Sequence, residues 1–157
     1  MNWLLLIPIL ISAGAVSFSI YSYTSTRRRE LAWKRTEFLF TQAQYLDNDP
    51  DLIEAVNILE GRHTEITISQ ILEDENLEKA KKNKHLKQID KLLNFLWRLG
   101  YAYLETKTIS QREVEAFGWY FRRISELPSL KKYCDENGYA EINRVIAKLE
   151  YIKALKE

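Results

Sequence analysis

The chain has 157 residues, of which 46% are hydrophobic and 29% are charged, and its 23 basic and 22 acidic side chains give a formal net charge of +1. This length suits one domain and excludes two of ordinary size, and the balanced charge excludes a generally basic nucleic-acid-binding protein. The single cysteine, Cys134, excludes an internal disulfide framework and is typical of a reducing compartment.

The N-terminal segment predicts one transmembrane helix. Residues 1–26 contain no Asp, Glu, Lys, Arg or His, and the run from Trp3 to Tyr23 is mostly apolar. In a helix, Trp3 and Tyr21 would stand about 27 Å apart, close to the thickness of the hydrocarbon core, so both aromatic rings can reach an interface.

The charges that follow this segment predict its orientation. No Lys or Arg precedes the span, whereas a basic cluster follows it: Arg27, Arg28, Arg29, Lys34 and Arg35. The positive-inside rule then places the N-terminus outside and the domain in the cytoplasm. We therefore expect a single-pass membrane protein with an anchor over residues 1–26, a cytoplasmic helical domain over 27–157, and basic side chains that face the lipid surface.

A cleaved secretory signal is the alternative reading of the same segment. Leu4 to Ile11 is an apolar core, and Ala13-Gly14-Ala15 offers the small residues that a signal peptidase accepts. No basic residue precedes the core, however, and the apolar run continues to Tyr21 before the arginines begin. These features favour a retained anchor.

The anchor also carries a stripe of small residues. Ser12, Ala15, Ser19 and Ser22 are spaced by three, four and three residues, which places them on one side of a helix. Small residues let a second transmembrane helix approach closely, so the stripe is a candidate contact face. The alternative is that these residues are simply tolerated in the span.

Helical signals continue after the anchor. Apolar residues recur at helical spacing up to Leu46, and the helix should end before Asp47. Asp49 is a natural N-cap with Pro50 at the first helical position, and Gly61 signals the end of the helix that follows. We expect residues 64–68 to form a connector and Ser69 to cap a short turn of helix. Asn76 should start a long central helix that reaches Tyr103.

The C-terminal third predicts three further helices. Ser110 and Glu113 have the spacing of a capping box, and a helix should run from there to Ile124. A short helix should begin near Pro128 and close at Asn137-Gly138, and the last helix carries apolar residues from 142 to 152. The predicted fold is all-α, with one N-terminal transmembrane helix followed by a compact bundle of five to six helices.

This order of elements resembles a widespread bacterial family of single-pass, membrane-anchored, all-helical proteins of unknown function. The residues that carry the resemblance are Trp33-Lys34-Arg35-Thr36-Glu37-Phe38, Asp49-Pro50, Gly100-Tyr101 and Asn137-Gly138-Tyr139. The resemblance covers most of residues 30–150 and implies an anchor and a helical domain. It implies no activity, no cofactor and no site residues.

No pattern in the sequence indicates a catalytic or metal site. Glu60 and His63 have the spacing found in carboxylate-bridged di-iron helices, but Gly61 interrupts this one copy, so we expect no metal ligands. His63 and His85 are expected to be exposed or to cap helices. Cys134 lies on a predicted inward face beside two acidic residues, which disfavours a thiolate. Phosphate-binding loops are also missing, so we expect no cofactor and no enzymatic activity.

Two features favour binding. Six lysines lie between residues 79 and 91 and follow a group of acidic residues. This pattern is typical of a solvated helix surface, and the alternative is that the lysines bind anionic lipid. Trp97, Trp119 and Tyr120 fall off the inward stripes and form a candidate partner surface.

These patterns lead to one leading hypothesis and two alternatives. The leading hypothesis is a membrane-tethered helical interaction module, an accessory or scaffold subunit of a larger membrane complex. Its partners are the lipid bilayer and a protein in or at the membrane, without nucleic acid or metal. The alternatives are a sensor of anionic lipid surfaces and an enzyme whose site is assembled from distant residues.

Overall fold

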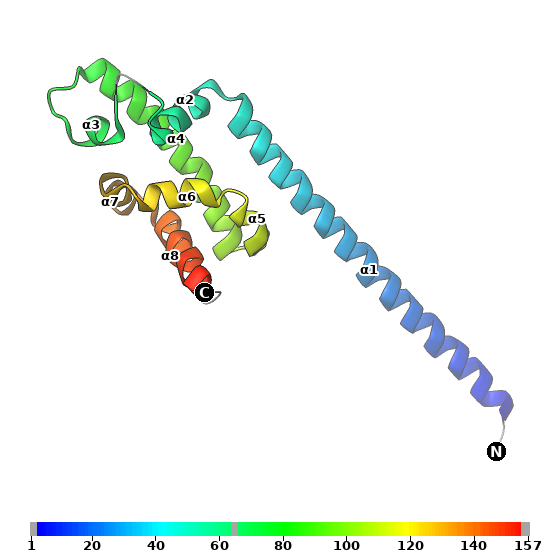
Figure 1. Cartoon of the computed structure of the whole chain (residues 1–157). Helices are drawn as coiled ribbons and strands as arrows, with labels where there is room; N and C mark the ends of the chain where they lie inside the picture. Colours follow the sequence, from blue (N-terminus) through cyan, green and yellow to red (C-terminus); the bar gives the residue numbers. More distant parts are fainter. Residues whose placement is uncertain (1–2, 64–65, 155–157) are drawn as a thin grey trace. The chain divides into compact units, whose positions relative to one another are not determined.

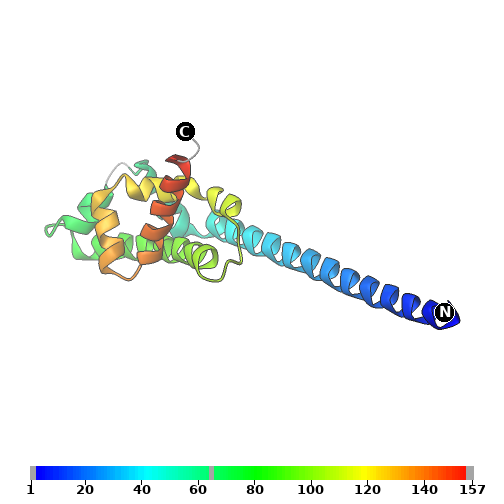
Figure 2. The same cartoon turned by 90° about the horizontal axis from the view of Figure 1, so that it is seen from below.

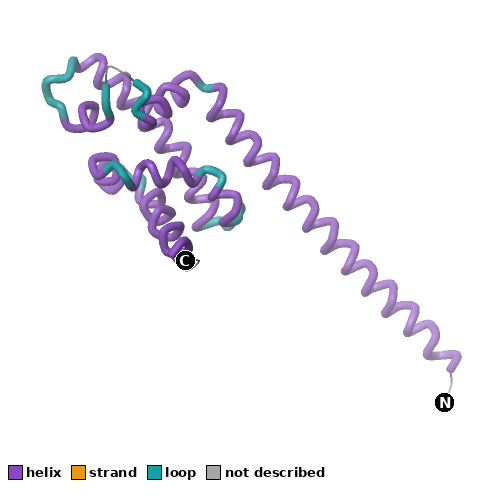
Figure 3. The backbone as a smooth tube through the Cα atoms, viewed as in Figure 1, coloured by secondary structure: helices purple, strands orange, loops and turns teal. Residues whose placement is uncertain are grey.

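The computed structural model describes the backbone of residues 3–63 and 66–154, and the side chains of residue 12 and of residues 14–63 and 66–154. The described residues form eight helices, labelled in Figure 1, and no strand (Figure 3), which confirms the all-α prediction. The chain divides into two units, Met1–Thr41 and Gln42–Glu157.

The described residues of the first unit, 3–41, belong to helix α1 (Trp3–Asn48), whose last residues belong to the second unit. Most of its described apolar side chains are exposed, among them Val16, Phe18, Ile20 and Tyr21, while Phe38 and Leu39 are half-buried. Among the residues that the structure describes, no helix combines the length and the apolar composition needed to cross a membrane. The predicted anchor falls partly outside them, because the side chains of residues 1–11 and 13 are not described.

Helix α1 ends within the second unit at Asn48, two residues later than predicted, because the backbone N–H of Asp49 still donates to the carbonyl of Tyr45. The bounds of the next helix are set by local signals as predicted. Helix α2 (Pro50–Glu60) starts after Asp49, whose side chain accepts hydrogen bonds from the backbone N–H groups of Asp51 and Leu52. The helix ends at Gly61, which has φ of 73° and lies in the left-handed region that glycine adopts without strain.

Two predicted helix starts are wrong. Helix α3 (Ile68–Glu73) is capped by Thr67 rather than Ser69, because Thr67 and Gln70 form a reciprocal capping box. Helix α4 (Lys79–Leu104) begins three residues after the predicted Asn76. The backbone N–H of Asn76 donates to the side chain of Asp74 at 2.8 Å, so this segment closes a local turn in place of a helical turn.

The predicted helix from Ser110 to Ile124 is divided in two. The capping box of Ser110 and Glu113 is present and starts α5 (Gln111–Glu115), but α6 begins only at Gly118 and ends at Ser125. Between them Phe117 has ψ of 9° and is buried, with its ring centroid 5.8 Å from that of Phe95. The helix is interrupted at Phe117, where the ring is buried. Among the described residues, α1 is followed by seven helices, whereas five or six were predicted.

The chain closes with α7 (Pro128–Glu136) and α8 (Ala140–Ala154). Gly138 between them has φ of 84°, which agrees with the predicted glycine stop. Helix α4 is the centre of the second unit, because both α2 and α8 pack against it. Figure 2 shows α8 (red) meeting α4 (green). The buried side chains of α4 form much of the core and include Leu92, Leu93, Phe95, Leu96 and Leu99.

Candidate functional site

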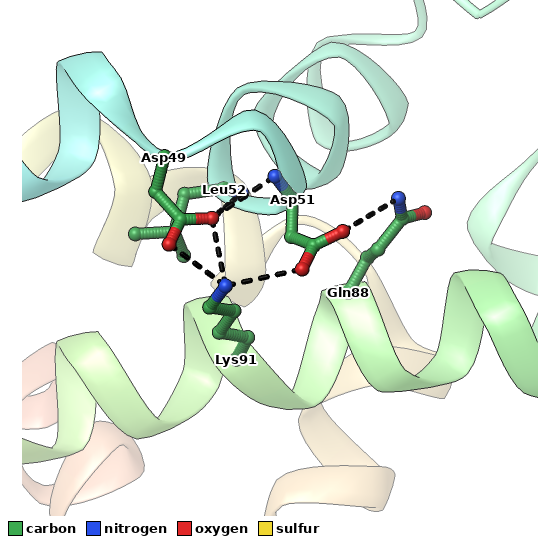
Figure 4. Close-up of polar contacts among 5 residues, drawn as sticks. All are labelled: Asp49, Asp51, Leu52, Gln88 and Lys91. Atoms are coloured by element: carbon green, nitrogen blue, oxygen red, sulfur yellow. Dashed lines mark hydrogen bonds and ion pairs between the residues drawn. The ribbon is translucent and has the colours of Figure 1, made fainter.

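The densest polar cluster in the described residues joins the start of α2 to the middle of α4 (Figure 4). The Nζ atom of Lys91 lies 2.7 Å from one carboxylate oxygen of Asp49 and 2.8 Å from the other. The same Nζ lies 3.1 Å from an oxygen of Asp51. The N-cap geometry of Asp49 fixes its carboxylate at the helix start, so α4 supplies the cation to a pre-positioned pair of acids.

This cluster keeps its charges at neutral pH. Hydrogen bonds to Asp49 and Asp51 raise the pKa of the Lys91 ammonium from 10.5 to about 12. The hydrogen bond from Lys91 is also the largest cause that lowers the pKa of the Asp49 and Asp51 carboxyl groups below 3.8. A lysine held in this state is neither a nucleophile nor a general base, so the cluster acts as a clamp between α2 and α4.

We expect the stability of the second unit to fall at both pH extremes. The two aspartates have lowered folded-state pKa values, so their contribution is present above 3.8 and is lost as the pH falls further. Lys91 has a raised folded-state pKa, so its contribution is complete below 10.5 and is lost as the pH rises towards about 12. Urea denaturation followed by tryptophan fluorescence across pH measures both slopes.

The matched variants are Lys91→Met and Lys84→Met, since Lys84 is an exposed lysine two turns earlier on α4. Lys91→Met should flatten the acid slope, whereas Lys84→Met should keep it. Equal acid slopes in the two variants would show that the ion cluster does not couple folding to pH.

A chain of polar contacts extends from this cluster to both histidines. Gln88 donates to Asp51 at 3.3 Å, and its side-chain oxygen lies 3.0 Å from Nδ1 of His85. The ring of His85 meets that of His63 edge to face at 5.4 Å, and Nε2 of His63 lies 3.0 Å from Glu54. The prediction that His85 is exposed or a cap is wrong, because packing of α2 against α4 buries it and Gln88 supplies its polar partner.

A second cluster joins α4 to α7 and α8. The hydroxyl of Tyr133 donates to Asp90 at 2.9 Å, and that of Tyr139 lies 3.4 Å from the same oxygen. Burial and then the nearby Asp90 charge raise the pKa of Tyr139 to about 12, and burial likewise moves the pKa of Tyr133 well above its usual range. Both phenols therefore remain protonated donors at neutral pH and bind α7 and α8 to the central helix.

Cys134 is fully buried on α7. Burial, with a smaller effect of the Asp135 charge, raises the pKa of its thiol from 9.0 to about 12. The thiol is therefore neutral at physiological pH and is shielded from reagents, as its place on the inward face of the predicted helix suggests.

We expect Cys134 to react with a thiol-specific reagent only when the protein opens. At mildly alkaline pH its rate should be on the order of 100-fold or more below that of an exposed cysteine, because reaction requires an opening of the core. Ala147→Cys provides the exposed comparison on α8 in the same molecule. Two reaction phases of similar rate in that variant would contradict this prediction.

The three residues of the predicted aromatic surface lie on two different helices, α4 and α6. Trp97 on α4 is half-buried, donates to Glu141 at 2.5 Å and stacks on Tyr101. Trp119 and Tyr120 lie on α6 with their rings edge to face at 5.1 Å, and Trp119 is 44% exposed whereas Tyr120 is half-buried. Only Trp119 among the three presents a large exposed ring.

The predicted site residues of the anchor region all lie on α1. Arg27, Arg28, Arg29 and Lys34 are exposed and Arg35 is half-buried. The small residues Ser12, Ala15, Ser19 and Ser22 are exposed, and the Ser19 hydroxyl donates to the carbonyl of Ala15 at 2.9 Å. Within the described part of the chain, no group of three or more His, Cys, Asp and Glu side chains is arranged to hold a metal ion.

The long-range clusters were missed at the sequence level because their members lie far apart in the chain. Asp51 and Lys91 are 40 residues apart, and Asp90 and Tyr133 are 43 apart. No regular spacing in the sequence indicates these contacts, although the capping role of Asp49 could be predicted.

Comparison with known proteins found no matching family model, no matching curated protein and no matching solved structure.

Proposed function

We propose that this protein is a membrane-tethered helical interaction module that serves as an accessory or scaffold subunit of a membrane complex. In this proposal residues 1–26 form the anchor, with the N-terminus outside and the helical unit in the cytoplasm. The observation that carries the proposal is an N-terminal segment of 26 residues without Asp, Glu, Lys, Arg or His, followed at once by three arginines. The resemblance to anchored helical proteins agrees with it.

The titratable groups of the second unit support a binding role over catalysis. Their pKa shifts keep Asp49, Asp51 and Lys91 charged and keep Cys134 and Tyr139 neutral. Catalytic acids and bases are instead shifted towards the working pH. The pKa values of these groups are shifted away from neutral pH, as is expected of groups with a structural role. A structural role for these groups agrees with a rigid binding scaffold.

Arginine substitution within the proposed span tests the tether. Full-length protein should remain in the membrane pellet after alkaline carbonate extraction, whereas Ile11→Arg combined with Val16→Arg should release it. Each arginine near the bilayer centre disfavours insertion by about 2.5–3.5 kcal/mol. Leu31→Arg, which lies after the three arginines and outside the proposed span, is the control and should stay in the pellet. Wild-type protein in the supernatant would disprove the tether.

The orientation of the protein in the membrane can be measured separately by cysteine labelling. In intact cells a membrane-impermeant maleimide should label Asn2→Cys, and it should leave Ala147→Cys unlabelled until the cells are opened. The buried thiol of Cys134 gives little background. Labelling of Ala147→Cys in intact cells would place the helical unit outside.

The partner surface is tested through Trp119, the exposed ring of α6. If Trp119 contacts a protein partner, Trp119→Ala should weaken co-purification of that protein by roughly tenfold or more, as for an aromatic hot spot. Tyr101→Ala, which removes an exposed ring from α4, should leave the yield unchanged. Equal yields from both variants would remove Trp119 from the proposed surface.

The exposed lysines of α4 favour a second candidate function, the recognition of anionic lipid. Lys79, Lys81, Lys84 and Lys87 are exposed at the start of α4, whereas Lys91 is held by Asp49 and Asp51. Each exposed lysine could contribute about 1 kcal/mol near an anionic membrane. A fragment of residues 30–157 should then float with anionic liposomes and sink at high salt. Flotation that is equal with neutral liposomes would contradict this function.

A further inference from the structure

The two histidines of the chain meet in the second unit. The ring of His63, two residues after the end of α2 at Gly61, lies edge to face on the ring of His85, which is buried on α4, with 5.4 Å between the centroids. The sequence contains no other histidine, and histidine is the side chain type that ordinarily gains its charge between pH 5 and 8. A response of the second unit to pH in this range is therefore expected at this contact.

The hydrogen bonds of the two rings fix which nitrogen of each carries the proton. The amide nitrogen of Gln88 donates to Asp51, so the amide oxygen faces His85 and accepts from its Nδ1 at 3.0 Å. Nε2 of His63 lies 3.0 Å from a carboxylate oxygen of Glu54, which only accepts. An additional proton must therefore go to Nε2 of His85 or to Nδ1 of His63.

This contact accommodates one added charge but not two. Nδ1 of His63 is buried and has no hydrogen-bond partner among the described residues. Glu54 gives His63 a negative counter-charge, whereas His85 reaches a carboxylate only through the neutral amide of Gln88. Two protonated rings at this distance repel each other. We therefore expect the packed pair to hold one added proton and to take a second only when the rings separate.

The other charged groups around the rings do not compensate a second charge. From the elements that pack together here, they are Asp51, Glu54 and Glu60 of α2, Arg62 after it, Glu73 of α3, and Lys81 and Lys82 one turn before His85 on α4. Asp51 already pairs with Lys91 at 3.1 Å. Glu60 already pairs with Arg62 at 2.6 Å, and Glu73 is exposed at the end of its helix. The two lysines add positive charge, which disfavours a proton on His85 further.

We propose that the His63–His85 contact is a pH-sensitive latch, which holds the C-terminal end of α2 against α4 at neutral pH and releases it on acidification. When the rings separate, each binds its own proton, whereas the packed pair binds one. The separated form therefore binds the additional proton, so its population rises as the pH falls, by up to tenfold per pH unit. The latch goes beyond the proposed interaction role and does not depend on the anchor.

The other end of α2 provides an internal reference. There Lys91 pairs with Asp49 and Asp51, and these hydrogen bonds lower the pKa of both carboxyl groups below 3.8 and raise that of the ammonium to about 12. These groups therefore keep their charges throughout the range in which histidine titrates. Acidification within this range should loosen one end of α2 and leave the other end closed.

Amide hydrogen exchange of the full-length protein in detergent micelles tests the latch. It is followed by NMR between pH 8 and 5.5 and corrected for the intrinsic exchange rate at each pH. The backbone N–H of Arg62, which donates to Asn57 at 2.9 Å, reports on the latch, and that of Ile53, which donates to Asp49 at 3.0 Å, is the reference. Protection of Arg62 should fall by about tenfold or more, whereas protection of Ile53 should stay constant.

Substitution of the rings assigns the effect. His63→Gln and His85→Asn each remove a titrating ring and keep a hydrogen-bonding side chain, so each should reduce the pH dependence at Arg62. The two changes together should abolish it. Lys84→Asn removes an exposed charge next to His85 and is the matched control, which should keep the wild-type pH dependence. His63 is less buried than His85, so His63→Gln remains informative if the change at the buried site impairs folding.

Three results would overturn the latch. The first is protection of Arg62 that stays constant across the pH range in the wild-type protein. The second is an equal loss of protection at Ile53, which would mean that acidification destabilises the whole of α2. The third is an unchanged pH dependence in the double histidine variant, which would assign the response to other groups.

Discussion

Phe95→Ala should destabilise the second unit by about 3–5 kcal/mol, a large share of the stability of a domain this size. The Phe95 side chain is 2% exposed on the central helix α4. Its ring lies 5.8 Å from that of Phe117 and 6.5 Å from that of Tyr45, so alanine leaves a cavity and removes two aromatic contacts. Urea denaturation followed by the fluorescence of the tryptophans in the second unit measures the change.

Phe40→Ala is the matched control for this prediction. Phe40 is 63% exposed on α1, so removal of its ring should change the free energy of unfolding by less than about 0.5 kcal/mol. Phe95→Leu keeps much of the volume and should lie between the two alanine variants. A loss for Phe95→Ala no larger than that for Phe40→Ala would show that α4 is not the centre of the core.

Gly100→Val should destabilise the same unit by about 1–3 kcal/mol. A Cβ atom at residue 100 would stand 3.2 Å from a methyl carbon of Val145 and 3.5 Å from Cβ and the carbonyl oxygen of Glu141. Val145 is fully buried, so it has little room to move. Valine has a higher helix propensity than glycine, but only by a few tenths of a kcal/mol, so the steric effect dominates.

A compensating variant identifies the cause of this loss. Val145→Ala alone leaves a cavity, but combined with Gly100→Val it supplies room for the new side chain, so the two changes together should cost less than their sum. Ala147→Val on the exposed side of α8 should have a small effect. Strict additivity of the two core changes would contradict close packing of α4 against α8.

Prediction of the fold from the sequence succeeded at several local signals, although it missed one of the same kind, the capping box of Thr67 and Gln70 that starts α3. The N-cap of Asp49 with Pro50, the stop at Gly61 and the capping box of Ser110 and Glu113 each depend on residues within one turn of each other. Such motifs satisfy backbone groups that a helix end leaves unpaired, and they do so whatever the rest of the chain does. The helical periodicity of the apolar residues was likewise enough for the all-α class.

Local reasoning failed where a distant group competes with it. Phe117 interrupts a helix because its ring packs against Phe95 from α4. His85 looks like one more polar residue in a lysine-rich stretch, yet α2 covers it and Gln88 pairs with it. The contact of Phe117 with Phe95 and the burial of His85 could not be predicted from the spacing of residues in the sequence.

The sequence by itself determined the all-α class, most helix ends and the inward position of Cys134, because each follows from short-range hydrogen bonding or from the period of the helix. Only the tertiary structure decided which polar side chains meet: Lys91 with Asp49 and Asp51, and Asp90 with Tyr133 and Tyr139. These features depend on the angle and register at which helices pack, and the packing is set by the fit of many buried side chains at once.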